Sequence, residues 1–143
     1  MTLRPATPAD SSKLADLTTQ LGYPTSPEEA EERLRDLASQ PENAVLVVEE
    51  DGEVAGWIHV SALRSLEMEP CAMIQGLVVD EPRRGGGIGA ALVEAAADWA
   101  AGHGFRTLRV RSNSVRERTH AFYERLGFTR TKSQVVLSRP VGD

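Results

Sequence analysis

The sequence predicts an α/β (α+β) fold around a mixed, mostly antiparallel sheet, in the order β-α-α-β-β-β-α-β-α-β. Two patterns predict it: apolar runs of strand length, and stretches in which leucine or alanine recurs at helical spacing after a helix-start signal. Hairpin turns and helical crossovers both connect the strands, so antiparallel and parallel pairs are expected in one sheet. The length of 143 residues and the 41% hydrophobic content suit a single domain that spans residues 1–143.

Local signals place the helices of the first half. Thr7 followed by Pro8 is the N-cap and first-position chemistry that begins a helix, and Gly22 ends that helix. Ser26 and Glu29 form a capping box that begins the second helix.

The strands of the first half are apolar runs between turn signals. We expect strands at residues 3–6, 44–49, 54–63 and 71–79. The dipeptide Asp51-Gly52 predicts a hairpin between the second and the third. Gly76 interrupts the fourth, which is typical of a bulge or of a close backbone approach.

The second half continues the alternation of helices and strands. A long helix follows a Gly-rich segment and ends at Gly102, and residues 107–111 alternate as a strand does. A capping box formed by Ser114 and Glu117 predicts a last helix, which Gly127 ends. Residues 129–138 are predicted to form a final, mixed strand.

Charge and composition disfavour several classes of partner. A nucleic-acid binder should present a basic face, whereas this chain has a net charge of −5 and a pI of about 5.3. No apolar run reaches the roughly 18 residues of a membrane span, and no histidine–cysteine constellation suggests a metal. Cys71 is the only cysteine and lies in an apolar strand, which predicts a buried, inert thiol. We therefore expect a cytoplasmic protein without nucleic-acid, membrane or metal partners.

A basic, Gly-rich turn between an apolar strand and a long helix is the most informative segment. Backbone N–H groups converge at such a helix start, where the helix dipole already favours negative charge. Glycine allows close approach and positive φ, and Arg83 and Arg84 add charge-assisted donors. The segment lacks the Lys-Ser/Thr ending of a Walker loop, and Leu92 stands where a dinucleotide fold requires its third glycine. The turn therefore predicts a cradle for a different pyrophosphate ligand.

Two blocks of sequence carry a resemblance to a known superfamily. The first is Arg84-x-x-Gly87-x-Gly89-Ala90, and the second is Ala121-Phe122-Tyr123-Glu124-Arg125-Leu126-Gly127-Phe128. Their order and separation resemble the acetyl-coenzyme A signature and the acceptor-side block of the Gcn5-related N-acetyltransferase superfamily. The resemblance implies two central strands that splay apart, acetyl-CoA as co-substrate, and an amine that attacks it directly in a ternary complex. It also implies a possible homodimer, since dimers are common in the superfamily.

The resemblance assigns roles to particular residues. Tyr123 corresponds to the general acid that protonates the leaving thiolate. Asn113 is either a capping residue at a strand-to-helix junction or a coenzyme contact. The strand backbone before the turn would pair with the pantetheine amides and meet the thioester carbonyl. The expected coenzyme-binding residues are Leu77, Val78, Val79, Arg84, Gly85, Gly86, Gly87, Ile88, Gly89, Ala90 and Asn113.

The general base and the acceptor stay open. Many family members carry a glutamate on the strand before the turn, but this sequence has Met73 and Gln75 in that region. Glu67, Glu69, His59 and a water chain are alternative bases. The acceptor could be a small polyamine or amino acid, an aminoglycoside-like antibiotic or a protein amino group.

Two further alternatives concern the protein as a whole. A non-catalytic acyl-CoA sensor could use the same cradle, although a sensor does not require the proton donor that Tyr123 offers. A longer acyl group than acetyl is also compatible with the sequence. In this fold the loop between the first two helices contributes to acceptor selectivity, which makes Tyr23 a candidate acceptor contact.

Overall fold

A computed structural model describes residues 1–112 and 117–142, which fall into two compact units. Unit 1 is Met1–Arg111 and unit 2 is Ser112–Asp143. The strands of unit 1 are β1 (Thr2–Pro5), β2 (Asn43–Glu50), β3 (Glu53–Leu63), β4 (Cys71–Val79) and β5 (Leu108–Val110). Its helices are η1 (Pro8–Asp10), α1 (Ser11–Leu21), α2 (Pro27–Ala38), η2 (Glu81–Arg83) and α3 (Ile88–Gly102). Unit 2 contains α4 (Glu117–Arg125).

The sheet of unit 1 is mixed, as the sequence predicts. Its strand order is β1-β2-β3-β4-β5. The pairs from β1 to β4 are antiparallel, and β4 pairs with β5 in parallel. The parallel pair is the one that α3 connects, because a parallel neighbour requires a crossover.

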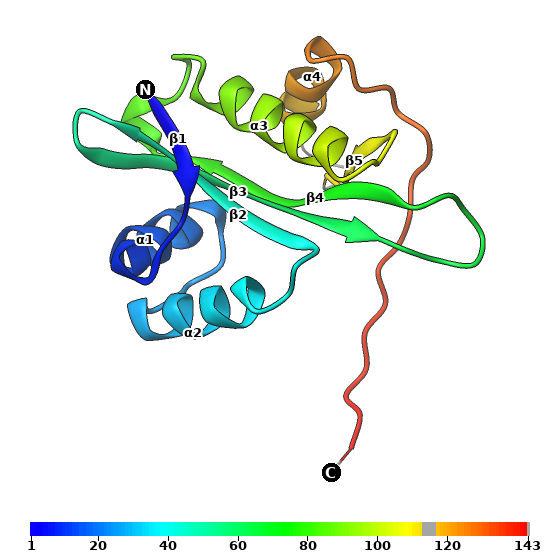
Figure 1. Ribbon diagram of the computed structural model, residues 1–143, viewed down its shortest axis with the longest axis horizontal. Coiled ribbons are helices and arrows are strands. Elements are labelled where there is room, and N and C mark those ends of the chain that lie inside the picture. The colour runs from blue at the N-terminus through cyan, green and yellow to red at the C-terminus, as the bar shows by residue number, and fades with distance from the viewer. Residues whose placement is uncertain (113–116, 143) are drawn as a thin grey trace. The chain divides into compact units, whose positions relative to one another are not determined.

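Helices cover both faces of this sheet (Figure 1). The helices α1 and α2 lie on one face and α3 lies on the other. On the α1–α2 face, leucines of both helices pack on valines of β2, β3 and β4, with Trp57 partly buried beside them. On the other face, Ile88, Leu92 and Val93 of α3 are buried, because its apolar residues recur at helical spacing.

Capping chemistry sets the helix starts where the sequence places them. The hydroxyl of Ser26 accepts the N–H of Glu29 at 3.1 Å, and the Glu29 carboxylate accepts the N–H of Ser26 at 2.9 Å. Thr7 caps a short 3₁₀ turn that leads into α1, and Gly22 ends α1 with φ at 116°. The hairpin between β2 and β3 turns at Asp51 and Gly52, whose φ angles are 55° and 77°.

The strands β4 and β5 share only a short stretch of pairing. Ala72, Met73 and Ile74 pair with Leu108–Val110. In the described part of the chain, residues 75–79 have a neighbouring strand on the β3 side alone. Gln75 lies where the β3–β4 register shifts, opposite the step from His59 to Val60. The pairing of β4 with β5 thus ends early, next to a bulge in β4, and the splay of these strands that the family resemblance implies stays a prediction.

Two glycines allow β3 and β4 to pack closely. The aromatic ring of Trp57 lies over Gly76, where an added Cβ would be 2.8 Å from the ring. Gly56 lies against the carbonyl oxygen of Val78, which an added Cβ would meet at 2.8 Å, and against Leu92 of α3. The sequence predicts a bulge or a close backbone approach at Gly76; in the structure a register shift lies beside it at Gln75, and the group that approaches Gly76 closely is the Trp57 side chain.

Unit 2 consists of α4 and the segment that follows it. The ring of Tyr123 contacts the rings of Phe122 and Phe128 edge-on, at centroid distances of 5.1 and 5.4 Å. Gly127 ends the helical turn with φ at 95°, as predicted.

The prediction of a final strand at residues 129–138 is wrong. None of the described residues 129–142 lies in a strand, and Val135, Val136 and Leu137 are 83%, 85% and 89% exposed. Their β-branched and aliphatic side chains favour a strand only where a neighbouring strand and a packed face are present.

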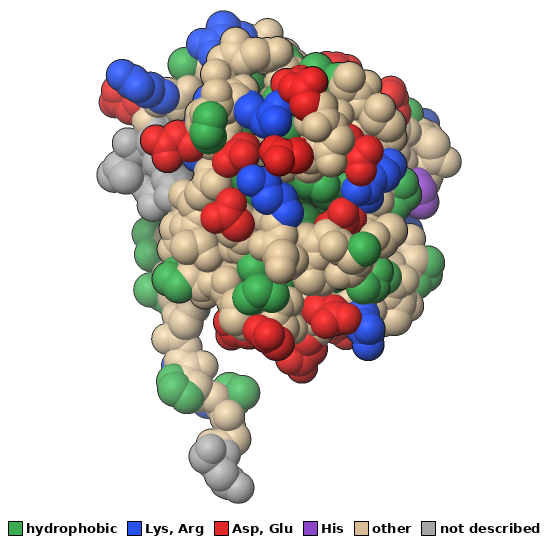
Figure 2. All heavy atoms as spheres, turned by 90° about the vertical axis from the view of Figure 1, so that its left-hand side faces the viewer, with side chains coloured by type: hydrophobic (Ala, Val, Ile, Leu, Met, Phe, Trp, Pro, Cys, Tyr) green, Lys and Arg blue, Asp and Glu red, His purple; other side chains and the backbone are tan. Residues whose placement is uncertain are grey.

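The surface carries both signs of charge. On the face that Figure 2 shows, the described acidic and basic side chains are interspersed rather than gathered into a basic patch. None of the helices described is both long enough and apolar enough to cross a membrane.

Replacing Gly56 tests the close packing of β3, β4 and α3. The Gly56→Ala variant should lose about 1–3 kcal/mol of unfolding free energy, because the backbone oxygen of Val78 cannot move aside alone. Urea unfolding followed by circular dichroism measures this loss. Gly102→Ala is the matched control, since nothing lies within 4 Å of its added Cβ, and it should be neutral or stabilising. Equal stability of both variants would show that β4 can shift away from β3 without cost.

Candidate active site

The Gly-rich turn between η2 and α3 adopts a conformation that only glycine reaches without strain at two positions. Gly85 and Gly87 have φ angles of 86° and 89°. An added Cβ would meet nothing within 4 Å at either position, so the turn faces open space. Glycine is therefore required here by the positive φ angles, and it also leaves room for a ligand to approach. Packing within the described chain does not require it.

The backbone donors of this turn are available. Within the described part of the chain, none of the N–H groups of residues 85–90 has a hydrogen-bond acceptor. The first bond of α3 in this region is made by Ala91, whose N–H donates to the carbonyl of Gly87 at 3.0 Å. The free donors at a helix start carry partial positive charge, which suits an anion. A carboxylate or a phosphate is therefore the ligand chemistry that this turn fits.

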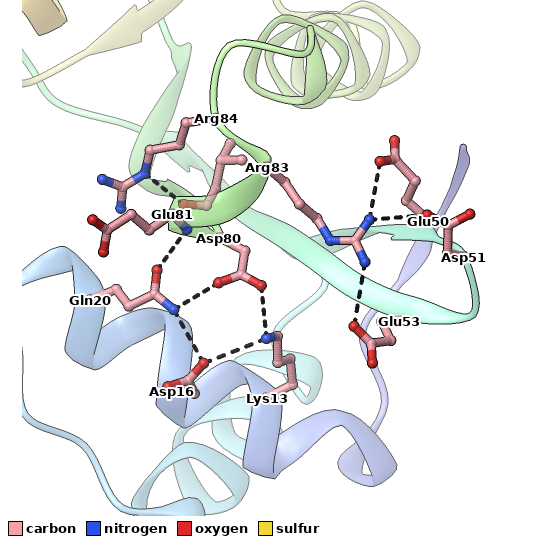
Figure 3. A network of polar contacts seen from close by, with 11 residues as sticks. Lys13, Asp16, Gln20, Glu50, Asp51, Glu53, Asp80, Glu81, Arg83 and Arg84 are labelled. Atoms are coloured by element: carbon pink, nitrogen blue, oxygen red, sulfur yellow. Dashed lines mark hydrogen bonds and ion pairs between the residues drawn. The ribbon is translucent and has the colours of Figure 1, made fainter.

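Arg84 links the turn to the edge of β4. Its Nε donates to the carbonyl of Val79 at 2.9 Å (Figure 3). The remaining guanidinium N–H groups of this exposed side chain have no partner among the described residues, and they stay available to an anion.

The open edge of β4 presents alternate backbone groups. The carbonyl of Val78 lies against Gly56 of β3, whereas that of Val79 accepts from Arg84 instead. Backbone groups alternate sides along a strand, so Leu77 faces the same side as Val79. Val78 lies between them with its side chain buried at 4% exposure. The edge beyond the end of the β5 pairing therefore offers the polar groups of Leu77 and Val79.

The expectation that Arg83 serves the glycine turn is wrong. Its guanidinium lies 3.1 Å from the Glu50 carboxylate, and it reaches Asp51 and Glu53 at 3.4 Å. These three carboxylates belong to the β2–β3 hairpin (Figure 3). Arg83 therefore ties η2 to the hairpin, and its charge is already neutralised.

Sequence reasoning also missed Asp80, which precedes η2. Its side chain is 12% exposed, and it accepts hydrogen bonds from Lys13 and Gln20 of α1. The hydrogen bond from Gln20 and the ion pair with Lys13 hold the pKa of Asp80 below its usual value. The only signal available in the sequence was an acidic residue directly after an apolar strand.

The predicted general acid is a buried phenol. Tyr123 is 7% exposed, and burial raises its pKa to about 12. The phenol therefore keeps its proton over the whole neutral range and can serve as a donor. Asn113, the other residue predicted near it, lies outside the described residues.

The candidate bases differ in their surroundings. His59 is half-buried, which lowers its pKa, and its Nε2 lies 2.8 Å from Oδ1 of Asn43. A neutral imidazole that donates to Asn43 satisfies this contact. The Glu69 carboxylate lies 3.9 Å from Arg106, and Glu67 is exposed on the same loop.

Two further candidates have clear positions. Tyr23 is 66% exposed in the turn between α1 and α2, as a contact for an external ligand must be. Cys71 is buried in β4, which confirms the prediction of a buried thiol.

Among the residues that the structure describes, no group of three or more histidine, cysteine, aspartate or glutamate side chains is arranged to hold a metal ion.

Comparisons with known proteins agree with this fold. The model of the acetyltransferase (GNAT) family matches residues 12–128. Aminoglycoside N(6')-acetyltransferase type 1 of Stenotrophomonas maltophilia is 30% identical over 144 residues, which cover 98% of this chain and 94% of that protein.

Solved structures show the same architecture. The apo structure of aminoglycoside 6'-N-acetyltransferase AAC(6')-IG from Acinetobacter haemolyticus gives a TM-score of 0.85 at 19% identity, over 99% of this chain and 100% of the other. AAC(6')-Iy in complex with the bisubstrate analogue CoA-S-monomethyl-acetylneamine gives 0.85 at 16% identity, over 98% of each chain.

The fold of this chain is the one that these acetyltransferases adopt. The chain belongs to the acetyltransferase (GNAT) family. The family resemblance is confirmed, and so is the fold class predicted from the sequence, apart from its final strand.

Proposed function

We propose that this chain transfers the acetyl group of acetyl-CoA to a primary amine of a small molecule or protein, by direct attack in a ternary complex. The amine nitrogen forms a bond to the acetyl carbon, the carbon–sulfur bond breaks, and the sulfur leaves as a thiolate that takes up a proton. The chain has four tasks in this reaction: to hold the pyrophosphate, to fix the thioester, to stabilise negative charge on the carbonyl oxygen, and to manage two protons.

The free backbone donors of the Gly-rich turn are the observation that carries this proposal. Residues 85–90 offer N–H groups without acceptors, on a turn where a Cβ would project into open space. The pyrophosphate of acetyl-CoA fits this donor set, with Arg84 as an additional cationic donor. The proposed cradle consists of Arg84, Gly85, Gly86, Gly87, Ile88, Gly89 and Ala90.

The open edge of β4 is the proposed site for the pantetheine arm. Leu77 and Val79 offer backbone groups on the side where β5 pairing has ended. Pantetheine contains amides, so it can pair with this edge as an added strand does. A backbone N–H of the edge would also meet the acetyl carbonyl oxygen and stabilise the charge that develops on it. Val78 supports the edge through its buried side chain.

Tyr123 is the proposed general acid, and Asn113 a proposed coenzyme contact. A buried phenol with a pKa of about 12 is fully protonated at neutral pH. It can donate a hydrogen bond to the sulfur and so stabilise the departing thiolate; transfer of the proton itself is uphill, because a thiol, with a pKa near 8.5, is a stronger acid than this phenol. The base that removes a proton from the amine is proposed to be a water chain or one of Glu67, Glu69 and His59.

An aminoglycoside is the acceptor that we propose first. The support is the curated relative at 30% identity, whose name states that it acetylates aminoglycosides. The charge of the chain agrees with it, because a protein with a net charge of −5 attracts a polycationic acceptor. Tyr23 is a proposed acceptor contact.

The organisation of the protein is also a proposal. We expect residues 1–143 to act as a single domain, to form a homodimer, and to work in the cytoplasm, where a free thiol such as Cys71 stays reduced. Size-exclusion chromatography with light scattering measures the oligomeric state.

A carboxylate placed in the cradle should abolish coenzyme binding. The Gly87→Glu variant strains a backbone with φ at 89° and brings negative charge to the phosphate site. Titration calorimetry should show tight acetyl-CoA binding to the unaltered chain, no binding of ATP or NAD, and no acetyl-CoA binding to the variant. Gly104→Glu is the matched control, since its φ is 82° and it lies at the far end of α3. Retained affinity in Gly87→Glu would refute the cradle.

Removing the phenol hydroxyl should slow the reaction without weakening the binding of acetyl-CoA. The Tyr123→Phe variant should lose about 10²-fold in kcat, because the thiolate leaves without its proton donor. Its dissociation constant for acetyl-CoA should stay within about twofold of the unaltered value. Stopped-flow turnover and calorimetry measure the two quantities. Unchanged turnover would show that Tyr123 is not the acid.

An acceptor screen tests the reaction itself. Thiol release from acetyl-CoA should be fastest with aminoglycosides that carry a 6'-amino group, ahead of polyamines, free amino acids and peptides with a free N-terminus. Mass spectrometry of the product should show one added acetyl group. Coenzyme binding without turnover of any amine would favour the non-catalytic acyl-CoA sensor. Faster turnover of a longer acyl-CoA would show that the transferred group is longer than acetyl.

A further inference from the structure

The glycine turn has little support of its own. Gly85 and Gly87 have no neighbour within 4 Å of the position that a Cβ would take, and residues 84–87 are exposed. The conformation of the turn must therefore be set by the residues at its two ends. At the C-terminal end, Ile88, the first residue of α3, is buried.

At the N-terminal end, side chains of α1 form hydrogen bonds with Asp80, the residue directly before η2. The two carboxylate oxygens of Asp80 have separate donors: Oδ1 accepts from Nε2 of Gln20 at 2.9 Å, and Oδ2 accepts from Nζ of Lys13 at 3.0 Å. Lys13 and Gln20 point from one side of α1 toward η2 (Figure 3). The Asp80 side chain is 12% exposed and both of its oxygens have donors, so its position is fixed: removing a donor would leave a largely buried charge without a partner.

Gln20 makes a second contact that reaches the backbone of η2. Its Oε1 accepts the N–H of Glu81 at 3.0 Å, while its Nε2 donates to Asp80. One side chain therefore holds both the side chain before η2 and the first N–H within it. Asp16 completes the arrangement by contacting both Gln20 and Lys13 on the same helix.

We infer that Lys13, Gln20 and Asp80 form a clasp that positions the glycine turn for the coenzyme pyrophosphate. The inference rests on the proposed function, since it assigns the coenzyme to that turn. The clasp residues are positioning residues that hold the start of η2. Arg83 and Arg84 hold its end, through the hairpin carboxylates and the carbonyl of Val79, and together these contacts set where the donors of residues 85–90 begin. A turn held in its binding conformation loses less conformational entropy when the ligand binds, so the clasp raises affinity without touching the ligand.

The experiment compares variants of the clasp in the full-length chain with acetyl-CoA as the probe. Gln20→Met keeps the length and helix propensity of the side chain but removes its polar contacts. It should raise the KM and the dissociation constant for acetyl-CoA about tenfold and leave kcat within about twofold. Lys13→Met should act in the same direction, and Lys13→Arg should restore most of the affinity by restoring the cation beside Asp80.

A matched control separates positioning from general destabilisation. Gln40→Met removes one exposed side-chain hydrogen bond, to Asn43, and should leave both constants unchanged. A purely structural role of the clasp would lower the melting temperature and the active fraction, hence kcat, with no change in KM. If Gln20→Met does not fold, the pair Lys13→Met and Lys13→Arg gives the same comparison.

The failures of the two proposals are distinguishable. No binding of acetyl-CoA by the unaltered chain would overturn the proposed function and the clasp together. Tight binding by the unaltered chain, with the same KM in Gln20→Met and Lys13→Met, would overturn the clasp alone.

Discussion

The early end of pairing between β4 and β5 is the constraint on which the site depends. Beyond Ile74, the β4 edge has no strand neighbour on the β5 side within the described residues. Leu77 and Val79 are only half-buried, so their backbone groups can pair with water, with a side chain or with a ligand. Arg84 supplies one such partner at the carbonyl of Val79, and the proposed coenzyme supplies the others. The early end of the pairing thus leaves backbone groups on the β4 edge with which a ligand that carries its own amides can form hydrogen bonds.

Anion binding by an acidic chain has to rely on local and directed donors. The net charge of −5 opposes a polyanionic coenzyme at long range, and Arg83 is occupied by the hairpin carboxylates. What remains is Arg84 and the peptide dipoles of the glycine turn. Salt screens long-range attraction strongly, whereas hydrogen bonds made in contact are affected less. The proposed site would therefore select by shape and donor placement more than by attraction at a distance.

Most of the fold could be predicted because its determinants are local in the sequence. The Ser26–Glu29 capping box and the Asp51-Gly52 turn place their elements within a residue or so. Local chemistry alone did not separate Arg83 from Arg84, because neighbouring arginines differ only in the direction that the fold gives them; the resemblance, whose motif begins at Arg84, put Arg84 alone in the expected coenzyme-binding set. The partners of Asp80 lie on a helix far away in the sequence, and no local pattern signals them. The final strand failed as a prediction because a strand depends on its neighbours as much as on its own residues.

The packing of Trp57 on Gly76 has an evolutionary consequence. The indole occupies the space that any side chain at position 76 would need, so the two positions cannot vary independently. Among descendants of this sequence, a larger residue at 76 becomes acceptable only after Trp57 has been exchanged for a smaller one. That exchange would open the sheet face beneath α1, so the order of substitutions is restricted. The pair should accordingly show correlated change in a deep alignment of close relatives.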